Sequence, residues 1–303
     1  MTPDLVCLGN LIVDDLVFAD GRTRMGEAGG AMLYSALAAR LWNVKVGIVS
    51  PLGSDYPRAA LAALEHHGID LSGLRALDGP GLRAWLLYEP DGRRVLHHLR
   101  AATHAAATPS FEDLPKSHHA ARIFHLTPSP RASQQALAGP LARIEGRIVA
   151  LDPHDPIRDD SLDAWRAVLA NVDVLFASEE ELTLPGAVDD PEHALARLGS
   201  SRLRTLVVKR GERGGVVFDA REGRLEWGPQ ATTVVDPTGA GDAFAGGFLA
   251  GRLEGEDLES CVEQGVVSAS FAIEEWGAAG LLGATPAAAK LRQQDWYAER
   301  ASG

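Results

Sequence analysis

The sequence has 303 residues, of which 46% are hydrophobic and 23% are charged, a balance that supports a large buried core. It excludes disordered, collagen-like and low-complexity chains. The 29 basic and 41 acidic side chains give a formal net charge of −12. This charge argues against a nucleic-acid partner, because duplex binding requires basic side chains that neutralise phosphates, and an anionic substrate would need a local positive field.

The two cysteines, Cys7 and Cys261, lie far apart in the sequence without the spacing of a metal or redox motif. This favours two buried, reduced thiols. No apolar run approaches the roughly 18 residues that a membrane span requires. Residues 1–4 carry no basic region typical of a signal peptide. We therefore expect a cytoplasmic protein with no membrane partner.

Short apolar runs alternate with helical patterns along most of the chain, which is typical of βαβ units and a mostly parallel sheet covered on both faces. Strands are predicted at 5–8 and 44–49, and helices at 33–41 and 57–67. Residues 82–88 and 93–99 flank Pro90-Asp91-Gly92, which predicts a β-hairpin. Further strands are predicted at 123–126, 148–151, 172–176, 206–208 and 216–218, and helices at 162–169 and 191–198.

No internal repeat, charge block or linker rich in Pro and Ser divides the chain into consecutive domains. We therefore expect a single α/β domain over residues 1–303. The hairpin is expected to belong to a small β appendage that is inserted into this domain.

The clearest chemical signal lies in residues 234–248. Residues 232–235 predict a short strand that enters a turn, and an apolar helix is expected to begin near Gly241. The amides of Gly239, Ala240 and Gly241 would then be unpaired at a helix N-terminus, which attracts anions. Asp242 falls in the first turn of that helix. A carboxylate beside an anion site suits phosphoryl transfer, which needs a base for the acceptor hydroxyl and donors for the moving phosphoryl group.

An ordinary helix start, in which Asp236 caps and Asp242 complements the dipole, is the alternative, and it would be preferred for an isolated Gly-Ala-Gly-Asp. A dinucleotide-binding fingerprint is excluded because Phe244 occupies its third glycine position. A P-loop is excluded because no lysine stands between Gly and Ser or Thr in the required pattern.

Taken whole, the stretch Asp236-Pro237-Thr238-Gly239-Ala240-Gly241-Asp242-Ala243-Phe244 closely resembles the C-terminal signature of the ribokinase-like (PfkB-type) carbohydrate kinases. Other landmarks follow the family's order along nearly the whole chain. They are the opening strand and acid at 9–14, the glycine pair at 29–30, a degenerate N-x-x-E motif at 178–181, and the nucleotide-binding turn at 208–214.

The resemblance implies a ribokinase-like fold, a three-layer α/β/α sandwich with a mostly parallel central sheet and a small inserted β lid. It implies direct transfer of the γ-phosphoryl group of ATP to a hydroxyl of a small sugar, sugar acid or polyol. Asp242 would be the general base. The anion hole would consist of Gly239, Ala240 and Gly241, and the acceptor site of Asn10, Asp14, Gly29, Gly30 and Arg100. The glycines would let the acceptor lie against the backbone.

ATP with Mg²⁺ is the implied cofactor, because the metal bridges the donor phosphates and offsets their charge. Glu181 would hold it through waters, and Asp236 with Thr238 matches a monovalent-cation site, for K⁺, in some members. The nucleotide site would consist of Lys209, Gly211, Gly214 and Thr238. For Lys209 taken alone, a solvated strand end is an equally open alternative.

Three departures from the family pattern qualify these expectations. Ser178 replaces the usual Asn of N-x-x-E, so one polar contact near the metal would be shortened or bridged by water. Residues 31–34, Ala-Met-Leu-Tyr, replace a polar stretch, which argues against a ribokinase. The lid is expected from residues 11–28 and 82–100, with most of it from the hairpin, because only 18 residues separate Asn10 from Gly29.

Two other functions stay open. A nucleoside kinase of the same family would need aromatic or apolar walls for the base, and Tyr34, Trp42 and Trp85 fit that role or ordinary packing equally well. A non-catalytic sensor of sugar or nucleotide would have lost the base or the anion hole, and this sequence keeps both. A homodimer formed through the lid is a further expectation from the resemblance.

Overall fold

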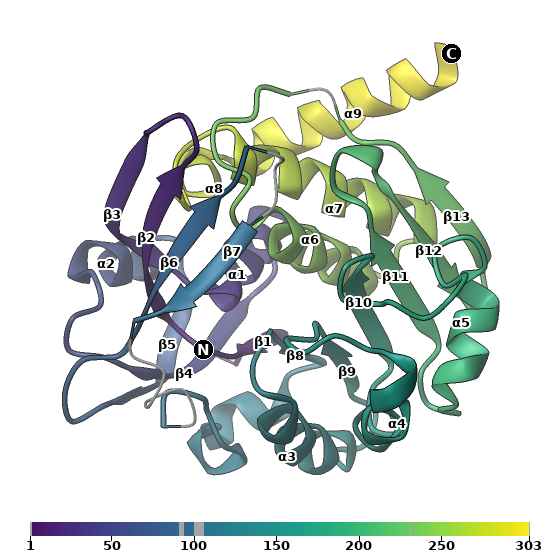
Figure 1. The fold of residues 1–303 in the computed structure, drawn as a ribbon, viewed down its shortest axis with the longest axis horizontal. Helices are drawn as coiled ribbons and strands as arrows, with labels where there is room; N and C mark the ends of the chain where they lie inside the picture. The colour runs from purple at the N-terminus through teal and green to yellow at the C-terminus, as the bar shows by residue number, and fades with distance from the viewer. Residues whose placement is uncertain (1, 91–93, 100–105, 231, 303) are drawn as a thin grey trace.

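The computed structural model describes residues 2–90, 94–99, 106–230 and 232–302 (Figure 1). A nine-stranded sheet forms the centre of the molecule, helices cover both of its faces, and a four-stranded sheet lies to one side. The predicted α/β sandwich with a mostly parallel sheet is therefore confirmed. In the described part of the chain, none of the helices is long and apolar enough to cross a membrane.

The central sheet contains the strands β1 (Leu5–Leu8), β4 (Val46–Leu52), β5 (Asp70–Ala76), β8 (Ile123–Leu126), β9 (Ile148–Leu151), β10 (Val174–Ser178), β11 (Thr205–Lys209), β12 (Gly215–Asp219) and β13 (Gly223–Trp227). Their order is β13-β12-β11-β10-β9-β8-β1-β4-β5. From β11 to β5 all neighbours are parallel, whereas β12 and β13 are antiparallel additions.

Two helical layers cover the central sheet. One contains α1 (Ala31–Leu41), α2 (Arg58–His66), α6 (Ala240–Glu254), α7 (Leu258–Ile273), α8 (Ala279–Gly283) and α9 (Pro286–Ser302), and the other contains α3 (Arg131–Ala142), α4 (Leu162–Leu169) and α5 (Pro191–Leu198). Successive strand side chains point to opposite faces, so Leu5 and Cys7 of β1 pack into the first layer and Val6 and Leu8 into the second. Short 3₁₀ segments span Phe111–Asp113, Lys116–Ala120, Asp159–Ser161 and Gly211–Arg213.

The small sheet has the order β3-β2-β6-β7, from β2 (Ile12–Phe18), β3 (Thr23–Gly29), β6 (Leu82–Tyr88) and β7 (Arg94–His98). The expectation that the hairpin at 82–100 would supply most of it is wrong. Each segment contributes two strands, because β2 and β3 form a compact antiparallel hairpin within the short first segment. The turn at 91–93 and Arg100 lie outside the described residues.

Residues 232–235 form no strand, in contrast to the prediction. The chain has already left the sheet after β13, and the Val235 amide donates to the Ile273 carbonyl at the end of α7 (2.8 Å). The sequence also gave no sign of β5, α3 or β13. Residues 26–29, which precede the predicted helix at 33–41, belong to β3.

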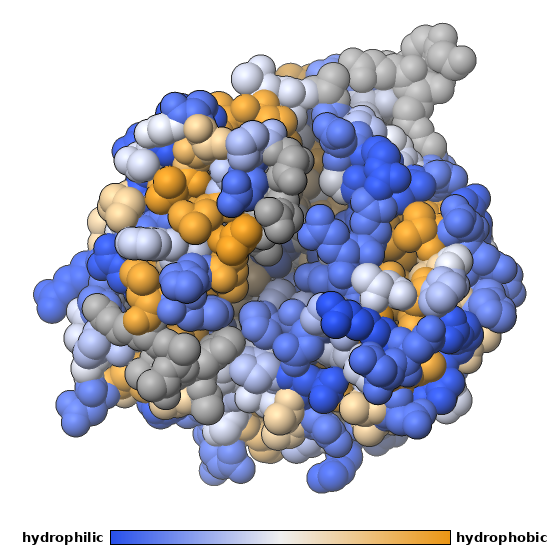
Figure 2. Space-filling model, viewed as in Figure 1, coloured by the Kyte–Doolittle hydropathy of each residue, from blue (hydrophilic) through white to orange (hydrophobic). Residues whose placement is uncertain are grey.

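The order of the strands reverses its direction between β1 and β8. The chain adds β4 and β5 on one side of β1 and then β8 to β11 on the other, and ligands of open α/β sheets bind beside the carboxyl ends of strands at such a reversal. The helix α6 packs against α1 and α7. Figure 2 shows this face of the molecule hollowed between the small sheet, where apolar side chains gather, and the polar surface opposite.

The packing of α6 on α1 predicts a large effect of one methyl group. A Cβ atom at Gly246 would lie 2.2 Å from the Ser35 carbonyl oxygen, whereas one at Gly283, in α8, would meet nothing within 4 Å. Gly246→Ala should lower the free energy of unfolding by about 1–3 kcal/mol. Gly283→Ala should change it by less than about 0.5 kcal/mol. Denaturant unfolding measures both, and equal values would contradict the close packing.

Candidate active site

The N-terminus of α6 forms one end of the site. Gly239 is the N-cap residue in the left-handed conformation (φ 78°), and the helix begins at Ala240, close to the predicted start. The Ala240 amide makes a long hydrogen bond to the Pro237 carbonyl (3.4 Å). Among the described residues, the amides of Gly239 and Gly241 meet no acceptor. Two of the three predicted anion-hole amides are therefore available to a ligand.

Close packing fixes this loop. A Cβ atom at Gly239 would lie 2.2 Å from the ring of Tyr34, which is buried on α1. The fully buried Asp236 accepts hydrogen bonds from the Thr238 amide (2.9 Å), the Thr238 hydroxyl (2.5 Å) and the Gly277 amide (2.9 Å). Asp236 thus holds the loop that precedes the anion hole instead of capping α6, and its role at a cation site stays a prediction.

Asp242 lies half-buried in the first turn of α6, near the ammonium group of Lys209. Lys209 Nζ is 2.6 Å from Asp152 Oδ1 and 3.5 Å from the Gly241 carbonyl oxygen. Burial disfavours the charged ammonium, but the carboxylates of Asp152, Glu181 and Asp242 outweigh this effect and raise the pKa of Lys209. Only 15% of its side chain is exposed, so the alternative of a solvated strand end is wrong.

Among the predicted acceptor residues that the structure describes, Gly29 lies against the buried carboxylate of Asp14 on β2, and Gly30 lies against the backbone of Asn10. A Cβ atom at Gly29 would lie 1.7 Å from Asp14 Oδ2, and one at Gly30 would lie 2.2 Å from the Asn10 carbonyl oxygen. Gly30 also has a φ of 103°, which disfavours other residues. The two glycines thus make room for Asp14 and for the Asn10 backbone, whereas the sequence suggested that they make room for the acceptor.

Asn10 presents an oxygen toward this region. Its amide nitrogen donates to the Ala107 carbonyl (2.5 Å) and to the Thr108 hydroxyl (3.1 Å). Its buried Oδ1 atom has no hydrogen-bond partner among the described residues. Since buried oxygens are normally satisfied, a ligand that donates a hydroxyl or amino hydrogen fits this position.

Two buried tyrosines connect the acceptor residues with α6. Tyr56 donates to the Gly29 carbonyl (3.3 Å). Burial and then the charges of Asp14, Asp236 and Asp242, together with Tyr88, raise the pKa of Tyr34 well above its usual value, so Tyr34 lies within electrostatic reach of these three carboxylates. The sequence offered Tyr34 only as a wall for a base. The available signal was its place four residues after Gly30, in the segment Ala-Met-Leu-Tyr that departs from the polar stretch expected from the family resemblance.

The N-x-x-E segment forms a reciprocal pair of hydrogen bonds. The Ser178 amide donates to Glu181 Oε2 (2.7 Å), and the Glu181 amide donates to the Ser178 hydroxyl (3.2 Å). In the described parts of the chain, no group of three or more His, Cys, Asp or Glu side chains is arranged to hold a metal ion. A single carboxylate, that of Glu181, fits a Mg²⁺ ion that would be bound mainly by nucleotide phosphates and water.

The predicted nucleotide-binding turn joins β11 to β12. The Arg210 amide donates to the Gly214 carbonyl (2.8 Å), which closes the turn. Gly211 (φ 57°) and Gly214 (φ 74°) both have left-handed backbones, and a Cβ atom at Gly214 would lie 2.0 Å from the Trp227 carbonyl oxygen. The segment is thus a hairpin connection in structure, and this leaves a role in nucleotide binding as a prediction.

Comparison with known proteins identifies the family. The family model described as "pfkB family carbohydrate kinase" matches residues 3–283. The chain belongs to the pfkB family. It is 33% identical over 279 residues to a cytidine kinase of Thermococcus kodakarensis, an alignment that covers 90% of this chain and 97% of that protein. It is 28% identical to a nucleoside kinase of Methanothermobacter thermautotrophicus, with 88% of this chain and 85% of that protein covered.

The fold of this pfkB-family protein also matches solved structures of the family. The structure of Arabidopsis thaliana ribokinase in complex with ribose and ATP superposes with a TM-score of 0.78 at 23% identity, covering 97% of this chain and 99% of that chain. The predicted ribokinase-like fold is therefore confirmed. As a member of the pfkB family, the protein is an ATP-dependent kinase with an alcohol group as acceptor.

The contact between Gly239 and Tyr34 predicts that this pfkB-family kinase does not tolerate a side chain at the start of α6. Gly239→Ala would combine a left-handed backbone with a collision against the ring, displacing the amides of the anion hole. We expect its kcat to fall by on the order of 10²-fold, as for loss of one oxyanion donor. Gly228→Ala, which meets nothing within 4 Å, is the control in the same ATP-consumption assay. Normal turnover by the Gly239 variant would contradict the proposed place of the phosphoryl group.

Proposed function

We propose that this kinase transfers the γ-phosphoryl group of ATP to a hydroxyl of a nucleoside, and that cytidine is the first acceptor to test. The observation that carries the proposal is that the Tyr34 ring packs against Gly239 at the start of α6 and lies within electrostatic reach of both Asp14 and Asp242. An acceptor that hydrogen-bonds to Asp14 and Asn10 would extend past this ring toward the N-terminus of α6. A cytidine kinase and a nucleoside kinase among the relatives support the nucleoside over the sugar that the sequence favoured.

In the proposed reaction, Asp242 accepts the proton of the acceptor hydroxyl as its oxygen attacks the γ-phosphorus. The bond between that phosphorus and the bridging oxygen of ATP breaks, and ADP leaves with the electron pair. The amides of Gly239 and Gly241 donate to the transferring group, aided by the positive end of the α6 dipole. Lys209 adds a fixed positive charge, which meets the need for a local field in a chain with a net charge of −12.

Cations belong to the same proposal. Mg²⁺ bound with ATP would offset the charge of the phosphates, and Glu181 is the residue that would hold it. For a monovalent cation such as K⁺, the candidate oxygen ligands are the carboxylate of Asp236 and the hydroxyl of Thr238. Both are buried beside the anion-hole loop, which supports this placement.

We further propose that the small sheet acts as the lid of the single domain. Tyr88 of β6 donates to the Thr238 hydroxyl (2.5 Å), because that hydroxyl itself donates to Asp236. Phe18 of β2 stacks on Tyr88 and meets the ring of Trp276 edge-on, with ring centroids 4.6 and 5.1 Å apart. A sheet held against the phosphate loop in this way would exclude water, the competing acceptor.

Removal of the base tests the mechanism. Asp242→Asn should fold normally and lose kcat by on the order of 10²–10⁴-fold, because the amide cannot accept the proton. Asp257→Asn is the control, since Asp257 caps α7 and Asn is an equally good cap. Purified variants are compared in a coupled ADP-release assay, and near-normal turnover by Asp242→Asn would remove this residue from the role of base.

The acceptor class is tested by a screen of nucleosides, ribose, fructose, sugar acids and inositols with ATP and Mg²⁺, with and without K⁺. We expect kcat/KM for cytidine to exceed that for ribose by about 10²-fold or more, because a site that binds the base loses those contacts with a bare sugar. A higher value for ribose would overturn the nucleoside assignment. Absence of turnover with every compound would favour the non-catalytic sensor.

A further inference from the structure

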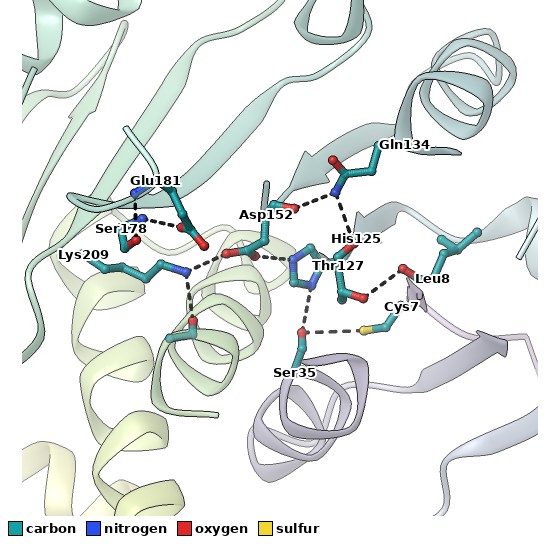
Figure 3. Close-up of polar contacts among 11 residues, drawn as sticks. Cys7, Leu8, Ser35, His125, Thr127, Gln134, Asp152, Ser178, Glu181 and Lys209 are labelled. Atoms are coloured by element: carbon teal, nitrogen blue, oxygen red, sulfur yellow. Dashed lines mark hydrogen bonds and ion pairs between the residues drawn. The ribbon is translucent and has the colours of Figure 1, made fainter. Parts of the chain in front are cut away.

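A chain of buried polar side chains runs from Lys209 to β1 (Figure 3). Lys209 Nζ is 2.6 Å from Asp152 Oδ1, and Asp152 Oδ2 is 2.8 Å from His125 Nε2. His125 Nδ1 is 2.8 Å from the Ser35 hydroxyl, which lies 3.7 Å from Cys7 Sγ. Asp152 is 2% exposed, and His125, Ser35 and Cys7 are fully buried.

Hydrogen-bond chemistry gives each link a direction. An ionised carboxylate only accepts, so His125 Nε2 donates to Asp152. In a neutral imidazole Nδ1 then accepts, and Ser35 donates to it. Cys7 completes the chain as donor to Ser35, because burial raises the pKa of this thiol to about 12 and keeps it protonated. The hydrogens on His125 Nε2, the Ser35 hydroxyl and the Cys7 thiol therefore each have an acceptor.

The backbone around Asp152 is also fixed. Gln134 of α3 donates from its side-chain amide to the Asp152 carbonyl (2.6 Å) and to the Thr127 carbonyl (3.2 Å), which joins the ends of β8 and β9. Two contacts thus fix Asp152: Gln134 of α3 binds its backbone carbonyl, and His125 of β8 binds its side-chain carboxylate. Such support suits a residue whose task is to define the position of another group.

Lys209 has three carboxylates around it and forms its direct ion pair with one of them. Asp152, Glu181 and Asp242 all raise the pKa of Lys209 against the effect of burial. Burial opposes the ionised form of Asp152, and Lys209 and His125 outweigh it, so the pKa of Asp152 is lowered. Both partners are charged at neutral pH. The Lys209 ammonium group lies 3.5 Å from the carbonyl oxygen of Gly241, in the first turn of α6.

We propose that Asp152 and His125 are positioning residues for phosphoryl transfer, which hold the Lys209 ammonium against the first turn of α6. Neither contacts the substrates. With Asp152 neutral, the direct ion pair of Lys209 passes to Asp242 or Glu181, which weakens Asp242 as a base and moves the positive charge away from the phosphoryl group. This inference rests on the proposed phosphoryl transfer but not on which alcohol accepts it.

The first test compares an Asp→Asn variant directly after β9 with one at the end of β12. Asp152→Asn should lower kcat by about 10²-fold while the KM values for ATP and acceptor change by less than about threefold. Asp219→Asn is the matched control, because Asp219 is also buried and pairs with Arg252 (3.0 Å) at the far end of β12. It should lose stability and keep its kcat. Equal kcat values for the two folded variants would overturn the proposal.

The second test separates the two ends of His125. The side-chain amide of His125→Gln reaches the Nε2 position and can donate to Asp152, whereas that of His125→Asn reaches only the Nδ1 position beside Ser35. Both variants replace the buried imidazole with a buried side-chain amide. We expect His125→Gln to keep kcat within about threefold of the wild type and His125→Asn to match Asp152→Asn. Similar kcat values for both would show that the bond to Asp152 has no part in catalysis.

A readout without acceptor turnover distinguishes the two levels of the argument. Calorimetry measures the affinity of each protein for ADP with aluminium fluoride and Mg²⁺, which mimics the transferring phosphoryl group. Asp152→Asn should bind this mixture about tenfold or more weakly than Asp219→Asn. If the wild type shows no turnover but the two variants differ in affinity as expected, only the proposed function is overturned. Equal affinities of the two variants overturn the positioning role.

Discussion

The close approach of α1 and α6 is the constraint on which the site depends. Both helices begin at the carboxyl edge of the central sheet, α1 directly after the glycine pair at 29–30 and α6 at Gly239. Their contact requires glycine where the Tyr34 ring and the Ser35 carbonyl meet α6. This packing brings the Tyr34 ring within electrostatic reach of both the Asp14 carboxylate on β2 and the Asp242 carboxylate in the first turn of α6. Distances between reacting groups are thereby set by the buried core.

Charge is distributed unevenly around this contact. The chain is strongly acidic, and the groups proposed to bind phosphate are main-chain amides, a helix dipole and one lysine. Lys209 keeps its charge in a buried place because Asp152 pairs with it directly. A buried ion pair adds little to stability when compared with apolar packing, which agrees with the proposal that this pair serves to place a cation.

The features that could be predicted from the sequence are those set by a local residue pattern or by a long motif. Helices at 162–169 and 191–198 have the predicted bounds, and the start of α6 was predicted within one residue. Residues 232–235 misled because their β-branched side chains favour a strand that tertiary packing does not provide. The partnership of Asp152 with His125 and Lys209 could not be predicted, since these residues are far apart in sequence and meet only through strand order. For Gly29 the structure gives a physical reason that the sequence did not suggest, the close approach of Asp14, and its place in an acceptor site stays a prediction.

The hydrogen bond between Tyr88 and Thr238 joins the small sheet to the same hydroxyl that Asp236 uses to hold the phosphate loop. Any outward swing of that sheet must break this bond and part the rings of Phe18 and Trp276. With the small sheet in its proposed role as a lid, release of the phosphorylated product would therefore also free the loop that precedes α6.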